Sequence, residues 1–187
     1  MYLCTKKGAN MKTNDAYMPD NVFRYVLGKD VDRVQTPLRV MSMLTNESLT
    51  VNAIWDTGST FSSVSHSVVS RLGLTDDGMG VGVGAGGMMT GRTSICFAFP
   101  GNTRWAAMVE AAQLPDVPGV PDFIIGLDII TLGDFRLTRE ADQNVLCFTF
   151  DKEVFIDFGN DSPETTIRKM EYFKYRLQKA YKQENKE

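Results

Sequence analysis

The chain has 187 residues, of which 43% are hydrophobic and 23% are charged, a composition typical of one globular domain with tails. A formal net charge of -3 gives no general attraction to nucleic acid or to an anionic membrane surface, so we predict no nucleic acid partner. No apolar stretch approaches the length needed to cross a bilayer, so we predict no membrane span.

The cysteines point to a reducing compartment. Cys4, Cys96 and Cys147 cannot all pair within one chain, and the last two lie in apolar runs, so we interpret both as buried small hydrophobic residues. The N-terminal residues lack a basic stretch followed by an apolar core, which argues against a signal peptide and favours a cytoplasmic protein. With one histidine and no clustered cysteines, we predict no metal site and no cofactor.

Alternation of apolar and polar residues between turn signals predicts a mainly β chain. In chain order the predicted strands are 22–25, 36–43, 49–55, 61–65, 93–99, 105–111, 123–126, 135–138 and 145–150. Short helices are predicted at 66–72, where Ser65 is suited to cap the first turn and Gly73 to end the last, and at 127–132. Residues 114–122 contain three prolines and are predicted to be an extended loop.

Glycines cluster at 78–91. Those at 82, 84 and 87 match a dinucleotide-binding pattern, but that motif needs a helix next, and here a predicted strand at 93–99 follows. A mobile β-hairpin lid fits the segment better, because glycines let such a lid bend. A plain flexible loop is the alternative.

The tail is predicted to be a helix that starts at Ser162-Pro163-Glu164 and runs to about residue 183. Residues 163–187 carry seven Lys/Arg and four Asp/Glu, a net charge of +3. Such a helix can bind a partner or a membrane surface, but we favour packing of its apolar face onto its own domain or a dimer partner. Asp157-Phe158-Gly159 resembles the kinase magnesium motif, which we discard because the other kinase motifs are missing.

The most informative motif is Asp56-Thr57-Gly58-Ser59-Thr60, which occurs once and directly follows the apolar run Ala53-Ile54-Trp55. It puts a carboxylate at the end of a predicted buried strand. A hydroxyl at Ser59 is expected to hydrogen-bond this carboxylate and to favour its charged form. A carboxylate presented in this way can serve acid–base catalysis when it shares a proton with a second carboxylate. Because the motif occurs once, the second aspartate must come from another copy of the chain.

The chain resembles the retropepsin-like aspartic proteases, the family of retroviral proteases and their cellular and bacterial relatives. Three features carry the resemblance in the family's order: the Asp-Thr-Gly turn at 54–60, a glycine-rich segment at 78–93, and Phe-Ile-Ile-Gly-Leu-Asp-Ile-Ile at 123–130 before a short helix. The resemblance covers about residues 37–150.

This resemblance implies an all-β retropepsin-like acid protease fold with short helices, closed as a homodimer, plus a C-terminal α-helix. It divides the chain into an N-terminal extension (1–33), the protease domain (34–160) and a C-terminal amphipathic helix (161–187). The implied activity is that of an aspartic endopeptidase with a polypeptide substrate. In retroviral members the chain ends form the dimer sheet, whereas long tails flank the core here.

The resemblance also assigns roles around the turn. Asp56 matches the catalytic carboxylate that each subunit supplies. Thr57 matches the threonine that hydrogen-bonds across the dimer beneath the site, and Gly58 matches the glycine whose carbonyl binds substrate backbone. Ser59 stands where some retroviral members have alanine. Together with Thr57 and Gly58, it is predicted to support the active site.

The glycine-rich segment matches the flap that closes over the substrate, with Gly84, Gly86, Gly87 and Met88 as its candidate substrate-binding residues. At Leu127-Asp128 this chain lacks the arginine that makes an intrasubunit ion pair in retroviral enzymes. A competing hypothesis from another functional class is a retropepsin-like peptide-binding or scaffold protein without turnover.

Overall fold

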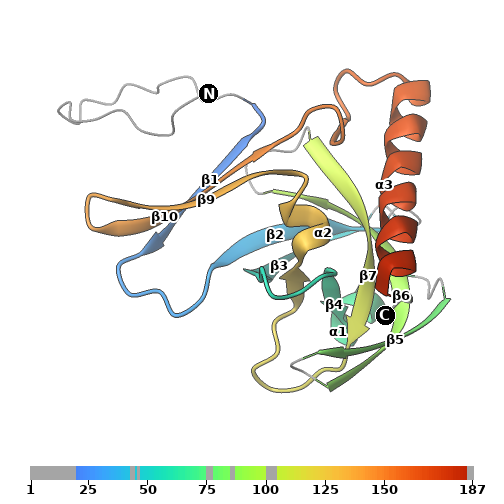
Figure 1. Cartoon of the computed structure of the whole chain (residues 1–187), viewed down its shortest axis with the longest axis horizontal. Helices are drawn as coiled ribbons and strands as arrows, with labels where there is room; N and C mark the ends of the chain where they lie inside the picture. The colour runs from blue at the N-terminus through green and yellow to red at the C-terminus, as the bar shows by residue number, and fades with distance from the viewer. Residues whose placement is uncertain are drawn as a thin grey trace.

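The computed structural model of the chain describes residues 20–42, 45, 47–74, 78–84, 87–99 and 105–184, which are mostly β (Figure 1). The strands are β1 (Val22–Gly28), β2 (Gln35–Met41), β3 (Ser48–Trp55), β4 (Ser63–Ser65), β5 (Gly78–Gly84), β6 (Gly87–Ala98), β7 (Trp105–Leu114), β8 (Phe123–Ile125), β9 (Gly133–Glu140), β10 (Gln143–Phe150) and β11 (Ile156–Asp157). The helices are α1 (His66–Arg71), α2 (Leu127–Ile130) and α3 (Pro163–Glu184). The all-β class with short helices and a C-terminal helix is therefore confirmed.

The larger sheet closes on itself. Its strands follow the order β11-β7-β4-β8-β3-β2-β6-β5, and β6 also pairs with β7, so the strands from β7 to β6 form a ring. Alternate side chains of these strands are fully buried in one hydrophobic core, among them Leu38, Ile95, Phe97, Phe123 and Ile125. The ring is thus a filled barrel around one hydrophobic core.

A second, three-stranded sheet has the order β1-β10-β9 and packs against the barrel core. Aromatic side chains make this contact, because the Trp55 ring at the end of β3 lies 5.2 Å from Phe148 on β10 and 5.4 Å from Phe135 on β9. β1 falls in the stretch predicted as an N-terminal extension, yet it pairs with β10 and places Phe23 in the core. Residues 1–19 of that stretch lie outside the described residues.

Several local predictions are confirmed at their expected positions. β2 and β3 pair as an antiparallel hairpin from Gln35↔Ile54 to Met41↔Ser48, and β9 and β10 form the closing hairpin. The Ser65 hydroxyl caps α1 by accepting from Val68 N, and the left-handed Gly73 follows its end.

Both described cysteines are buried and lie outside any disulfide, as predicted. Cys96 lies on β6 in a small cluster with Ala98 and Ala106, and burial raises the pKa of its thiol to about 12. Cys147 lies on β10. Neither thiol is bonded to another cysteine.

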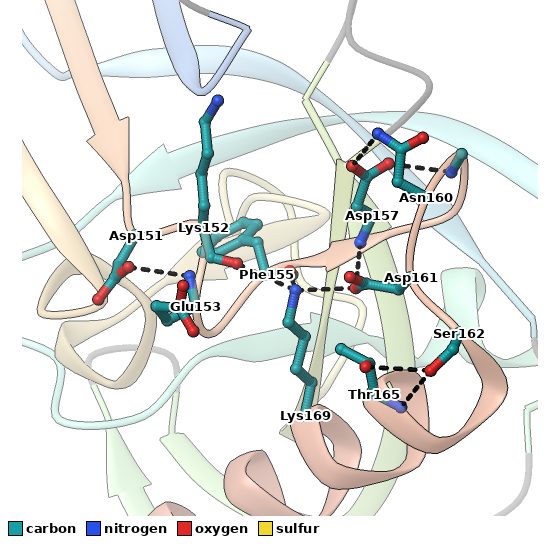
Figure 2. Close-up of polar contacts among 11 residues, drawn as sticks. Asp151, Lys152, Glu153, Phe155, Asp157, Asn160, Asp161, Ser162, Thr165 and Lys169 are labelled. Carbon is teal, nitrogen blue, oxygen red and sulfur yellow. Dashed lines mark hydrogen bonds and ion pairs between the residues drawn. The ribbon is translucent and has the colours of Figure 1, made fainter.

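α3 packs along β7 and β11, as Figure 1 shows at the right of the molecule. One lysine fixes it there (Figure 2). The buried Lys169 ammonium donates to Lys152 O at 3.0 Å and to Phe155 O at 2.7 Å, and it pairs with the Asp161 carboxylate at 2.8 Å. The tail packs on its own domain as predicted, but not through the whole of its predicted apolar face, because Ile167 is 56% exposed. None of the described helices is both long and apolar enough to cross a membrane.

Candidate active site

Asp56 stands where β3 leaves the barrel. β3 runs parallel to β8, with Trp55 opposite Ile125, and the next backbone amide, that of Asp56, donates to Ile125 O at 3.0 Å. The preceding amide of Trp55 donates to Val34 O at 2.9 Å. The strand end is held from two sides, so the position of the Asp56 backbone is fixed by the barrel and not by a mobile loop.

A backbone amide of the turn after Asp56 donates to the Asp56 carboxylate. The Gly58 amide donates to Asp56 Oδ1 at 2.9 Å, and the Ser59 amide donates to Asp56 O at 3.2 Å. Asp56 is half-buried, whereas Thr57 and Gly58 are exposed. A Cβ added at Gly58 would lie 3.2 Å from Asp56 Oδ1, so a side chain at this position would crowd the carboxylate. The turn presents one oriented carboxylate at the surface.

Ser59 does not make the bond that the sequence suggested. Its hydroxyl donates to Phe61 O at 2.8 Å instead of to the Asp56 carboxylate. A hydroxyl has one proton to donate, so in this conformation Ser59 shapes the turn beyond Asp56 and leaves the carboxylate to the Gly58 amide.

A second carboxylate, that of Asp128, accepts hydrogen bonds from the segment that follows the Asp-Thr-Gly turn. It accepts from Ser62 N at 3.0 Å, from Ser62 Oγ at 2.7 Å and from Ile129 N at 2.9 Å. The Ser62 hydroxyl in turn accepts from Gly126 N at 3.1 Å. These bonds join the start of α2 to the start of β4, and Ser62 is fully buried.

Backbone bonds complete this junction. Leu127 N donates to Ser59 O at 2.8 Å, and Asp128 N donates to Thr60 O at 3.2 Å. Gly126 makes the approach possible, because a Cβ there would lie 2.5 Å from the carbonyl carbon of Phe61 and 2.9 Å from Ser62 N. The Asp-Thr-Gly turn and the Ile-Ile-Gly segment, distant in sequence, are therefore one packed unit.

The sequence profile of the aspartyl protease family matches residues 40–129, the stretch that contains both halves of this unit. Over this stretch, 90 of the 187 residues, the chain is similar to the aspartyl proteases. The family resemblance predicted from the sequence is thereby confirmed. No curated protein matches the sequence closely enough to be called a relative.

Solved structures similar to this chain include three proteases or protease-like domains. A retropepsin-like aspartic protease from Rickettsia conorii is 10% identical, with a TM-score of 0.42, and the match covers 68% of this chain and 92% of that one. The retroviral protease-like domain of Ddi1 from Leishmania major is 20% identical with a TM-score of 0.44, covering 68% and 94%. The EIAV protease complexed with the inhibitor HBY-793 is 19% identical with a TM-score of 0.37, covering 54% and 86%.

The glycine-rich segment of the chain forms an antiparallel hairpin. β5 pairs with the first part of β6, with Met88 opposite Val83 and Gly87 opposite Gly84. β7 pairs with β6 only from Arg92 onward, so this part of the hairpin extends beyond the barrel wall, at the lower right of Figure 1. Gly86 lies outside the described residues.

Sequence reasoning missed the support that Asp128 gives to Ser62. It noted Asp128 only as a departure from the retroviral pattern. The available signal was the carboxylate of Asp128, two residues after the Gly126 that contacts the Asp-Thr-Gly segment, together with the serine at position 62 just after that segment.

Among the described residues, no group of three or more His, Cys, Asp or Glu side chains is arranged to hold a metal ion.

Proposed function

We propose that the chain is an aspartic endopeptidase that hydrolyses peptide bonds with two Asp56 carboxylates, one from each subunit of a homodimer. One observation carries the proposal: Asp56 is the single aspartate of a rigid Asp-Thr-Gly turn, exposed enough to meet a second copy and oriented by the Gly58 amide. A water-activating pair needs two such groups facing each other, and a two-fold axis supplies the second.

The chemistry needs only the pair and one water. Repulsion between two close carboxylates keeps one proton between them. The ionised carboxylate takes a proton from water as the water oxygen bonds to the peptide carbonyl carbon, and the protonated partner gives its proton to the carbonyl oxygen. The resulting diol then collapses: its carbon–nitrogen bond breaks, the leaving amine takes a proton from the pair, and one diol hydroxyl returns a proton to the pair as the product carboxyl forms. No covalent enzyme intermediate forms.

The other proposed roles follow from their places in the turn and the hairpin. Thr57 would hydrogen-bond across the dimer, Ser59 would support the turn, and the Gly58 carbonyl would bind substrate backbone. The β5–β6 hairpin would act as the flap, with Gly84, Gly86, Gly87 and Met88 against an extended peptide. Backbone pairing with such a peptide is compatible with many sequences, so side-chain pockets would set the specificity.

In this proposal residues 34–160 carry the protease domain, 1–33 precede it, and 161–187 add the helical tail. The two buried thiols, which lie outside any disulfide, support a reducing, cytoplasmic location.

The proposal is tested by incubating the protein with an unbiased peptide mixture from acid to neutral pH and reading cleavage sites by mass spectrometry. Asp56→Asn keeps the shape of the side chain and removes its acid–base function, and the exposed Asp30→Asn is the matched control. We expect cleavage by wild type and Asp30→Asn and none by Asp56→Asn. Cleavage that persists in Asp56→Asn would refute the mechanism, and a wild type without cleavage would favour a peptide-binding scaffold.

A further inference from the structure

A buried polar pair lies one residue before the candidate catalytic aspartate. Trp55, the last residue of β3, is 5% exposed, and its indole Nε1–H donates to the hydroxyl Oγ1 of Thr36 on β2 at 3.0 Å. Thr36 is itself 1% exposed. An apolar ring in place of the indole would fill this space without burying a polar group, so the pair adds a preferred direction to the packing and not only volume.

Four aromatic side chains contact the indole ring. Its centroid lies 5.2 Å from Phe148 and 5.4 Å from Phe135, both on the three-stranded sheet, and 5.7 Å from Phe99, which follows β6. Phe23 of β1 stacks on it at 6.5 Å with an interplanar angle of 13°. Ring contacts favour particular relative orientations. Both sheets of the molecule therefore restrain the orientation of the Trp55 side chain.

Backbone hydrogen bonds alone leave one motion of the β3 end weakly restrained. Trp55 N donates to Val34 O at 2.9 Å and Asp56 N donates to Ile125 O at 3.0 Å, so neighbouring segments hold β3 at its two edges. Such bonds run between strands within the sheet, and they oppose rotation of the chain about the strand axis least. The indole extends from the face of the sheet, so its bond to Thr36 and its ring contacts oppose that rotation.

Rotation of the strand end would displace the Asp56 carboxylate. The Gly58 amide, which donates to Asp56 Oδ1 at 2.9 Å, belongs to the turn that continues from this strand end and would move with it. Catalytic groups have to be held within about 0.5 Å of the productive geometry. A misplacement of about 1 Å can lower the rate by about a hundredfold.

We propose that Trp55 is a positioning residue for Asp56. Its bond to Thr36 and its aromatic contacts fix the rotation of the β3 end and thereby the place of the carboxylate in the site. Trp55 acts through the Asp56 backbone and takes no part in proton transfer. The inference rests on the proposed function, because it concerns the precision with which the Asp56 carboxylate is placed for the reaction.

Thr36→Val tests the proposal, because it removes the acceptor of the indole N–H and keeps the branched shape of the side chain. Thr36→Ser keeps a hydroxyl and should restore what Thr36→Val loses. Thr50→Val is the matched control, since Thr50 is exposed on β3 of the same hairpin. The two readouts are hydrogen exchange of the backbone amides, measured by mass spectrometry, and steady-state kinetics on a peptide that wild type cleaves.

We expect Thr36→Val to speed amide exchange at residues 55–59 by about tenfold or more, while exchange in the β9–β10 hairpin keeps its wild-type rate. The kcat should fall by about tenfold and KM should stay within about twofold, because the carboxylate moves and the β5–β6 hairpin does not. Thr36→Ser and Thr50→Val should behave as wild type in both measurements.

Unchanged exchange at residues 55–59 in Thr36→Val would overturn the proposal, and so would a kcat equal to that of wild type. Acceleration spread evenly over the whole domain would also overturn it, because Trp55 would then serve global stability alone. A wild type that cleaves nothing counts against the proposed function, and amide exchange then decides the positioning role by itself. If Thr36→Val fails to fold, Trp55→Phe removes the indole N–H, keeps an aromatic ring and takes its place with the same expected results.

Discussion

Replacing Lys169 by methionine should detach α3 from the barrel at a large cost in stability. The Lys169 side chain is 6% exposed, and its ammonium has three acceptors: two backbone carbonyls and the carboxylate of Asp161, whose side chain is 13% exposed. Removing one partner of a buried ion pair costs roughly 3–5 kcal/mol. Asp161 keeps its bond from the Asp157 amide at 2.8 Å, so we expect a loss in the lower part of that range, about 3 kcal/mol.

The measurement is denaturant unfolding at one fixed protein concentration, followed by circular dichroism and by tryptophan fluorescence. Lys169 Nζ lies 5.7 Å from the Trp105 ring, so the fluorescence reports on this contact. Arg168→Met is the control, because Arg168 is an exposed neighbour on the same helix whose replacement should change the unfolding free energy by about 0.5 kcal/mol or less.

A double variant sharpens the test. Lys169→Met with Asp161→Asn removes both charges, so it should be more stable than Lys169→Met alone, in which a carboxylate stays buried without its cation. The reasoning is refuted if Lys169→Met and Arg168→Met lower the unfolding free energy by the same small amount. It is also refuted if adding Asp161→Asn to Lys169→Met lowers the unfolding free energy further.

Three further predictions concern the barrel and the loop junction. Gly126→Ala should destabilise the protein by at least about 2 kcal/mol in denaturant unfolding, because the new Cβ would meet the Phe61 backbone at 2.5 Å, and an unchanged midpoint would contradict the packing described. Asp128→Asn should cost about 1–3 kcal/mol in the same assay, because the two Ser62 donors bond to different oxygens of the carboxylate and an amide replaces one of those acceptors with an NH2 donor. Burial raises the pKa of the Cys96 thiol from 9.0 to about 12, so the contribution of this thiol to stability is full below pH 9.0 and falls as the pH rises toward 12. Cys96→Ala should therefore flatten the alkaline decline of the unfolding free energy. An unaltered decline would argue against this assignment to Cys96.

The sequence predicted most strands because their side chains alternate. β2 and β3 bury every second residue, and the turn residues between them give the hairpin its register. The Asp-Thr-Gly turn was also predictable, since an apolar run that ends in these residues specifies a carboxylate at a strand end. These features are local in sequence, and local patterns are what single-sequence reasoning can read.

Features that depend on distant contacts were not predictable in the same way. Asp157-Phe158-Gly159, discarded as a kinase motif, is a turn in which the Gly159 amide donates to Asp157 Oδ1 at 2.9 Å, beside the Lys169 pair (Figure 2). The bond between Asp128 and Ser62 joins residues 66 positions apart. The sequence suggested the Asp56 carboxylate as the acceptor of the Ser59 hydroxyl, and only the fold decides that this hydroxyl donates to Phe61 O.

The central claim is that two Asp56 carboxylates from two chains form one site, and mixing subunits tests it most directly. Wild type and Asp56→Asn are unfolded together, refolded at varying ratios and assayed on a peptide that wild type cleaves. If each site needs both aspartates, an equimolar mixture contains about one quarter active dimers, and activity follows the square of the wild-type fraction. Activity that falls in direct proportion to the wild-type fraction would show that one chain suffices and would contradict the account.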